Sequence, residues 1–225
     1  MDRHSDFNKQ AIVHGGQIDW ISSPANGVSR KMLDRIGGEV ARATTIVRFD
    51  AGSSFAPHVH GGGEEFLVLE GIFQDEHGDY PAGSYIRNPP TSEHRPRSDQ
   101  GCIILVKLWQ FDPEDRQFVI QHKNSVEAFI DPLRKGVTIK PLYQDENETV
   151  RIENWKAEGE ITLGAPGGAE YFLLEGSFTL NGEIFSPYSW LRLPDNQTVS
   201  VKVGVEEAVL WSKTGHLRSI HLPHD

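Results

Sequence analysis

The chain has 225 residues, enough to bury the core of one large domain or of two small ones. Its 22 Lys and Arg residues stand against 32 Asp and Glu residues, which gives a formal net charge of −10 at pH 7. This acidic balance is the opposite of the basic surface that nucleic-acid binding requires. We therefore expect no nucleic-acid partner.

Hydropathy and cysteine content also limit where the protein resides. The longest unbroken apolar run is the five residues Cys102–Val106, far below the ~18 that a membrane span needs. The first ten residues, MDRHSDFNKQ, are polar and charged, unlike a secretory signal. A single cysteine, Cys102, allows neither an internal disulfide nor a paired-cysteine zinc site. These features favour a cytoplasmic protein without a membrane segment.

Short runs of β-branched and aromatic residues, bounded by Gly, Pro, Asn and Asp, predict strands joined by turns. Asn181-Gly182 predicts a tight hairpin, because both residues tolerate positive φ. No long stretch carries apolar residues at helical spacing, so we expect few and short helices and a sandwich or small barrel. The predicted strands are Thr44–Phe49, Phe66–Leu69, Ser84–Arg87, Ile103–Trp109, Ile161–Leu163, Tyr171–Leu174, Phe178–Leu180, Trp190–Leu193, Val199–Val203 and Ala208–Trp211.

An internal repeat organises these strands. Residues 65–73 read EFLVLEGIF and residues 170–178 read EYFLLEGSF, an offset of 105. At the same offset, the sequence SYIR of residues 84–87 meets SWLR of residues 189–192. Two copies of one unit predict two similar all-β barrels in tandem. The expected parts are an N-terminal extension (1–27), a first domain (28–111), a connecting segment (112–136) and a second domain (137–225).

The first copy contains a cluster of metal-ligand residue types. His58 and His60 are two residues apart, so on a strand both side chains point to one face, about 6.6 Å apart along the strand. The glycines at 61–63 allow the chain to turn back sharply, and Glu64 opens the returning strand. His94 arrives from a different strand. Three neutral imidazoles and one carboxylate suit a divalent first-row transition metal.

These residues match both motifs of the cupin superfamily, G-x5-HxH-x3-E-x6-G from Gly52 to Gly71 and G-x5-P-x4-H from Gly83 to His94. Thr91 stands where the second motif usually has Gly. The surrounding sequence further resembles the ChrR-type cupin group, closely over about 28–111 and in outline over the second copy. The resemblance implies a jelly-roll barrel in each domain, with a metal ion held by His58, His60, Glu64 and His94.

The chain departs from ChrR in one respect. ChrR resembles a fusion with a helical zinc-binding domain that grips a sigma factor through His and Cys ligands. Here the single cysteine lies inside the cupin region, and residues 1–27 are too short for such a domain. The departure weakens the expectation of a sigma-factor partner.

The second copy serves as an internal control for the metal site. At the offset of 105, the four ligand positions become apolar, so we expect the second barrel to hold no metal. Their counterparts are Leu163, Ala165, Ala169 and Val199.

The same control chooses between two adjacent glutamates. Glu64 and Glu65 point to opposite faces of a strand, and cupin spacing permits either as the ligand. Glu64 becomes Ala169 in the second copy, whereas Glu65 remains Glu170. Glu64 is thus the expected ligand, and Glu65 is expected to make a structural contact common to both barrels.

The site leads to three functional hypotheses. The first is a metal-dependent, dioxygenase-like enzyme that acts on a small oxygenated molecule such as a diketone or hydroxyketone. The second is a ChrR-like regulatory or sensor cupin without catalysis, and the third is a storage-type or structural bicupin. We expect one divalent ion per chain, with iron, zinc or manganese preferred and nickel or copper as alternatives. The chain is expected to form a homodimer, or to be a monomer whose two barrels mimic a cupin dimer.

Overall fold

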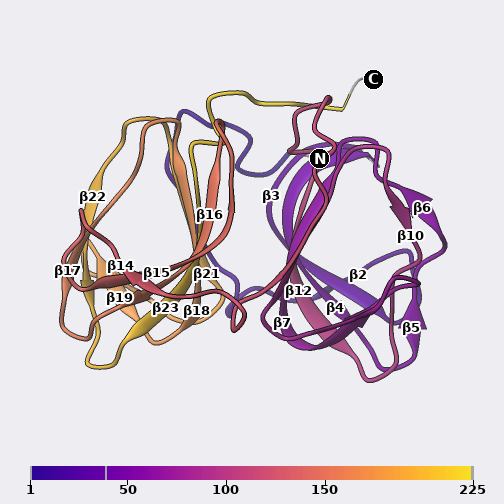
Figure 1. Ribbon diagram of the computed structural model, residues 1–225, viewed down its shortest axis with the longest axis horizontal. Coiled ribbons are helices and arrows are strands. Elements are labelled where there is room, and N and C mark those ends of the chain that lie inside the picture. Colours follow the sequence, from indigo (N-terminus) through magenta and orange to yellow (C-terminus); the bar gives the residue numbers. More distant parts are fainter. Residues whose placement is uncertain (1, 39, 224–225) are drawn as a thin grey trace. The chain divides into compact units, whose positions relative to one another are not determined.

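The computed structural model describes residues 2–38 and 40–223, which form two compact units (Figure 1). The first unit contains Asp19–His122 together with the described residues up to Ser5 and from His221. The second contains Asp6–Ile18 and Lys123–Ile220. Both units are built from strands, and no helix occurs in the described residues. Those residues accordingly contain no helix able to cross a membrane. The all-β prediction is confirmed.

The first barrel consists of β2 (Ile21–Ser22), β3 (Val28–Gly37), β4 (Ala41–Phe49), β5 (Ser53–Ser54), β6 (His58–Val59), β7 (Glu64–Gln74), β8 (Asp79–Pro81), β9 (Ser84–Asn88), β10 (Glu93–His94), β11 (Arg97–Ser98), β12 (Cys102–Leu108) and β13 (Val119–His122). Its main sheet runs in the order β13-β9-β7-β12-β4-β3-β2, and β6 pairs with β10 in a separate ribbon. All pairs are antiparallel.

The second barrel consists of β1 (Ala11–His14), β14 (Phe129–Ile130), β15 (Val137–Gln144), β16 (Thr149–Trp155), β17 (Glu160–Leu163), β18 (Ala169–Glu175), β19 (Phe178–Leu180), β20 (Glu183–Phe185), β21 (Ser189–Leu193), β22 (Val199–Val203) and β23 (Ala208–Thr214). One sheet runs in the order β1-β21-β18-β23-β16-β15-β14 and the other in the order β17-β22-β19-β20. Two sheets enclosing one core form the jelly-roll arrangement that the sequence predicted.

The strand registers follow the repeat. His58 lies opposite His94 in the β6–β10 ribbon, and Leu163 lies opposite Val199 between β17 and β22, so the ligand positions keep their pairing at the offset of 105. The predicted hairpin at Asn181-Gly182 is confirmed: these residues have φ of 51° and 85° and join β19 to β20.

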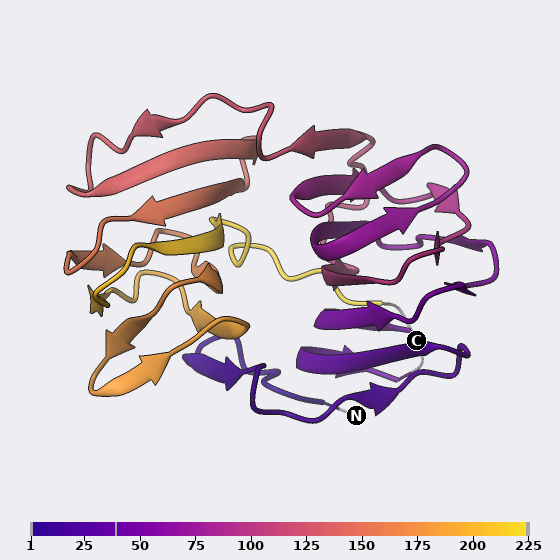
Figure 2. The same ribbon diagram turned by 90° about the horizontal axis from the view of Figure 1, so that it is seen from below.

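The two segments outside the repeats turn out to be equivalent strands. β13, from the connecting segment, pairs with β9 of the first barrel, and β1, from the N-terminal extension, pairs with β21 of the second (Figure 2). In both places an arginine of the repeat lies 4.2 Å from a phenylalanine ring: Arg87 over Phe111 and Arg192 over Phe7. The repeat comparison did not reveal that β1, which precedes the first barrel in the chain, joins the second barrel. The predicted domain boundaries stay predictions.

The interiors of the two barrels differ. In the second barrel, Trp155, Leu163 and Ala169 are fully buried in a continuous apolar core, and Val199 packs against it. In the first barrel, a smaller core that includes Phe66 leaves room for a cavity of about 550 Å³. The repeat therefore keeps its backbone scaffold while one copy keeps an open interior.

Candidate metal centre

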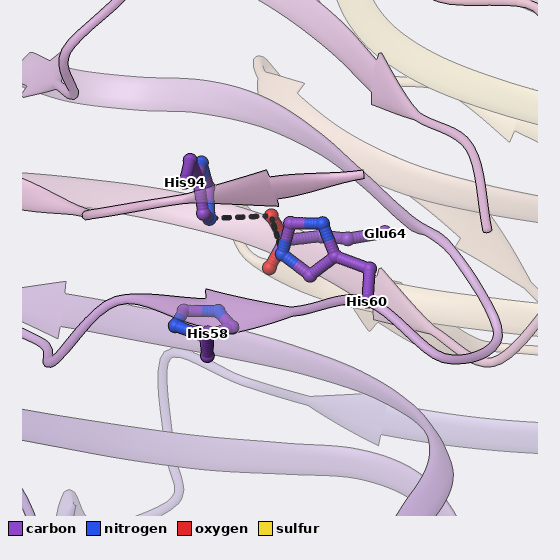
Figure 3. A group of neighbouring side chains, drawn as sticks. All are labelled: His58, His60, Glu64 and His94. Atoms are coloured by element: carbon purple, nitrogen blue, oxygen red, sulfur yellow. Dashed lines mark ion pairs between the residues drawn. The ribbon is translucent and has the colours of Figure 1, made fainter. Parts of the chain in front are cut away.

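The structure brings the four predicted residues together in the first barrel. One ligand atom from each of His58, His60, Glu64 and His94 lies within 4.8 Å of the others (Figure 3). His58 is in β6, His60 follows it, Glu64 begins β7 and His94 ends β10. The β6–β10 pairing and the turn at 61–63 thus deliver all four side chains to one point. His58 is the least buried of the four.

The atoms at the centre of this cluster are close but do not satisfy one another. Oε2 of Glu64 lies 3.3 Å from Nε2 of His60 and 3.3 Å from Nε2 of His94. Both Nε2 atoms are buried, and neither has a hydrogen-bond partner in the described residues. Burying a polar atom without a partner is costly. Unsatisfied imidazole nitrogens around a carboxylate fit the donor set of a divalent transition metal.

The opposite ring nitrogens of His58 and His60 are held by oxygen acceptors. Nδ1 of His58 donates to the carbonyl of Ala56 at 3.0 Å. Nδ1 of His60 lies 3.0 Å from Oγ of Ser92, whose own hydroxyl donates to the carbonyl of Pro89 at 2.6 Å. With its proton committed to Pro89, Ser92 accepts from His60. These contacts place the proton on Nδ1, so both Nε2 lone pairs are available for a metal ion.

Asp75 performs the same task for His94. Its Oδ2 lies 3.3 Å from Nδ1 of His94. Its Oδ1 accepts from the backbone N–H groups of His77 and Gly78 and from the Tyr80 hydroxyl, at 2.8 to 3.2 Å. A carboxylate that is fixed on one side by a turn, and whose other oxygen accepts from the ring of a ligand histidine, orients that ring. Asp75 is therefore a positioning residue, and the motif comparison did not single it out.

The electrostatic environment differs between the two buried histidines. Burial lowers the pKa of His60, which keeps its ring neutral near pH 7. Burial also acts to lower the pKa of His94, but the hydrogen bond with Asp75 and the negative charge of Glu64 outweigh it, so this pKa is raised. The pKa of Asp75 is lowered, because the hydrogen bonds from His94 and the backbone outweigh its burial. Protonation of His94 therefore competes with metal binding there.

The two adjacent glutamates occupy different environments. Glu64 faces the other three residues, and its Oε2 accepts from Nδ2 of Asn88 at 3.3 Å. Oε2 of Glu65 accepts from the Tyr85 hydroxyl at 2.6 Å. In the second barrel, Glu170 likewise accepts from the Trp190 ring nitrogen at 3.0 Å. The contact of Glu65 thus recurs where the histidines are absent.

The turn between His60 and Glu64 needs glycine for close packing as well as for its conformation. A Cβ on Gly62 would lie 2.2 Å from the ring of Trp109. Gly63 has a φ of 75°, and a Cβ there would lie 2.5 Å from the Phe111 ring. Thr91, where the motif usually has Gly, also has a φ of 75°. A β-branched residue such as Thr91 is strained in that conformation. The backbone N–H of Thr91 donates to the carbonyl of His60 at 2.9 Å, which ties this turn to a ligand residue.

Sequence reasoning missed Asp75, Asn88 and Ser92, although a signal for two of them was present. At the offset of 105, Asp75 becomes Leu180 and Asn88 becomes Leu193, both buried and apolar. These positions lose their polarity together with the four histidine and glutamate positions. A comparison of every polar residue between the copies would have found them.

The cavity beside the cluster is mainly apolar. His58, His60 and Glu64 line it together with Trp109 and residues of β4 and β12. Its volume of about 550 Å³ is in the range of small-molecule sites. Glu64 is the one acidic residue in the described lining, and no Lys, Cys or Tyr joins it there. The lining therefore offers no general base apart from the cluster itself.

Comparisons with known proteins agree with this architecture. Residues 8–112 match the family described as the ChrR Cupin-like domain. No curated protein matches the chain. A candidate dioxygenase from Nostoc punctiforme superposes with a TM-score of 0.78 at 13% identity, over 97% of this chain and 87% of that one. A candidate glyoxylate-induced protein from Pseudomonas aeruginosa gives 0.74 at 14% identity, over 96% and 92%.

Oxalate decarboxylase from Lactobacillus farciminis superposes with a TM-score of 0.62 at 11% identity, over 90% of this chain and 85% of that one. Identities this low show a common fold alone. The family match, the two jelly-roll barrels and the motif residues nevertheless agree with one another. Residues 8–112 match the ChrR Cupin-like domain, and the whole chain shares a two-barrel cupin fold with these solved structures.

Proposed function

We propose that the first barrel binds one divalent transition metal through His58, His60, Glu64 and His94, and that the protein is a dioxygenase-like oxidoreductase. Its substrate is a small oxygenated molecule such as a diketone or hydroxyketone. The observation that carries the proposal is the pair of buried Nε2 atoms, without hydrogen bonds among the described residues, that face the Glu64 carboxylate at 3.3 Å beside an open cavity.

The cavity supports a reaction that depends on the metal rather than on a separate protein base. When bound, the ion supplies Lewis acidity toward oxygen donors and, if it is iron, redox chemistry with dioxygen. Apolar residues make up most of the lining, and Trp109 packs on the glycine turn between His60 and Glu64. An acid–base isomerase would need a further carboxylate, histidine, lysine, cysteine or tyrosine, and the described lining supplies none beyond the cluster.

The match to the ChrR Cupin-like domain favours one alternative, a regulatory cupin that binds a ligand at the metal without turnover. Both functions need the same metal-binding residues, so they differ only in whether product forms. The homodimer, the cytoplasmic location and the identity of the ion stay predictions from the sequence.

Glu64→Gln should lose bound metal, whereas Glu65→Gln should keep it. Glu64 supplies the carboxylate oxygen that faces two imidazoles, so its loss should lower metal affinity by more than the roughly 10–100-fold typical of changes outside the ligand shell. Glu65 bonds to Tyr85 instead. Elemental analysis of both purified variants measures this. An empty Glu65→Gln protein beside a loaded Glu64→Gln protein would contradict the assignment.

Asp75→Asn should lower metal affinity by about 10–100-fold while the protein stays folded. The amide oxygen can still accept from the turn, but its NH₂ then faces Nδ1 of His94, which forces the proton onto the nitrogen meant for the metal. Competition with a chelating dye measures zinc affinity. Asp79→Asn is the matched control, because Asp79 bonds to Gln74. Equal affinity of wild type and Asp75→Asn would refute the role of Asp75.

The iron-loaded protein should consume oxygen with at least one member of a panel of 1,3-dicarbonyls and hydroxyketones, with product formed in proportion. Glu64→Gln should show no uptake above the uncatalysed rate. An oxygen electrode with product analysis by mass spectrometry measures both. Tight binding of a panel member without oxygen uptake or product would contradict the enzyme and support the regulatory alternative.

A further inference from the structure

The cavity beside the metal centre is positively charged, although the chain carries a formal charge of −10. Arg30 and Arg35 both line it. Glu64 is the only carboxylate in the described lining, and it belongs to the metal centre. With three neutral histidines, one carboxylate and a divalent ion, the centre itself would carry a net positive charge. No second lining carboxylate balances Arg30.

The strand register places Arg30 on the inner face of the barrel. It is two residues after the core residue Val28, so both side chains point the same way. Arg30 lies opposite Val47, which in turn lies opposite Ile104. Val47 and Ile104 line the cavity too. The guanidinium therefore belongs to an otherwise apolar row of the cavity wall.

The guanidinium of Arg30 has no protein partner in the described residues. Its Nε is buried without a hydrogen bond, and no carboxylate of the described residues forms an ion pair with Arg30. The neighbouring Arg35 differs, because its Nη2 donates to the carbonyl of Gly38. The pKa of Arg35 is lowered, mainly by burial and also by the positive charge of Arg30. A partly buried cation without a counter-charge is uncommon in proteins and costs free energy.

The second barrel shows what the same scaffold does with a buried guanidinium when no ligand is needed. Val28 and Val137 begin the equivalent strands β3 and β15, so Ile139 occupies the place of Arg30, and it lies opposite Glu153. Glu153 forms an ion pair with Arg134 at 2.8 Å, and Asp131 forms another with Arg134 at 2.7 Å. Two carboxylates thus balance the charge of Arg134 in the second barrel, whereas no described carboxylate pairs with Arg30 in the first.

We infer that Arg30 binds a carboxylate on the molecule that occupies the metal centre. The inference rests on the proposed function and narrows its substrate to an organic anion with an apolar middle. The row of residues that crosses the sheet from Arg30 through Val47 and Ile104 ends at Val68 in β7. Val68 is four residues from Glu64, which is about 13 Å in the strand direction. The arginine side chain shortens that span. The carboxylate thus lies several bonds from the oxygen atoms that face the metal centre.

The test uses full-length, zinc-loaded protein, so that binding is measured without turnover. The probes are 1,3-diketones with an unbranched chain of two to six methylene groups that ends in a carboxylate or, in the matched compound, in a methyl ester. Isothermal titration calorimetry gives the ratio of the two affinities for wild type, Arg30→Met and Arg48→Met. Arg48 is a matched control, since it stacks over Trp20 at 4.6 Å, outside the cavity lining.

At the best chain length, wild type should bind the carboxylate about 10–100-fold more tightly than the ester, as expected for hydrogen bonds to a charged group. Arg30→Met should lose this preference and keep its zinc, and Arg48→Met should keep both. A preference that survives in Arg30→Met, or that is lost equally in both variants, would overturn the inference. So would equally tight binding of the carboxylate and the ester by wild type.

A second measurement separates this inference from the proposed function. Metal-free protein is titrated with unbranched C6 to C10 alkanoates, which need no metal. Binding that Arg30→Met weakens about tenfold or more supports the anchor even if the diketones neither bind zinc-loaded protein nor turn over. Equal alkanoate binding by wild type and Arg30→Met overturns the anchor, even where the iron-loaded enzyme is active.

Discussion

The close approach of two buried imidazole nitrogens to one carboxylate oxygen, 3.3 Å each and without hydrogen bonds, is the constraint on which the first barrel depends. Each unsatisfied atom costs about 1–3 kcal/mol, so the surrounding structure must prevent rotation of the rings toward other partners. Asp75 and Ser92 do so by holding the far nitrogens of His94 and His60. The strained Thr91 and the glycine turn fix the backbone around them. A metal ion that replaces the missing partners would repay these costs.

The duplication shows how little of the scaffold this centre requires. The strand pair that places His58 opposite His94 in the first copy has a counterpart that places Leu163 opposite Val199 in the second. The buried glutamate contact also occurs in both copies, through Glu65 in the first and Glu170 in the second. The buried contacts of Glu65 and Glu170 therefore belong to the barrel, whereas the polar residues that the second copy replaces by apolar ones belong to the site. In the copy without ligand residues, large apolar side chains such as Trp155 occupy the interior. An open cavity and a polar centre appear together or not at all in this chain.

Much of the fold was predictable, because the repeat and the strand punctuation are local features of the sequence. The cupin motifs likewise grouped the four candidate ligands, since their spacing is set within two short segments. Asp75 and Asn88 could not be found from motif spacing, because only the folded barrel brings them to the cluster. The proposed role of Arg30 rests on the lack of a described carboxylate beside its guanidinium, and only the packing of the folded barrel shows this. The equivalent places of β1 and β13 could not be predicted, because these two segments have little sequence similarity and only their strand pairings relate them.

The central claim is that this chain builds one metal site, in the first barrel, and none in the second. The most direct test is an anomalous difference map from crystals of the metal-loaded protein, recorded at the absorption edge of the bound ion, with metal content per chain measured on the same sample. The account predicts one ion per chain and one peak, bonded to His58, His60, Glu64 and His94. A second tightly bound ion in the C-terminal barrel, or a single peak away from these four residues, would contradict it.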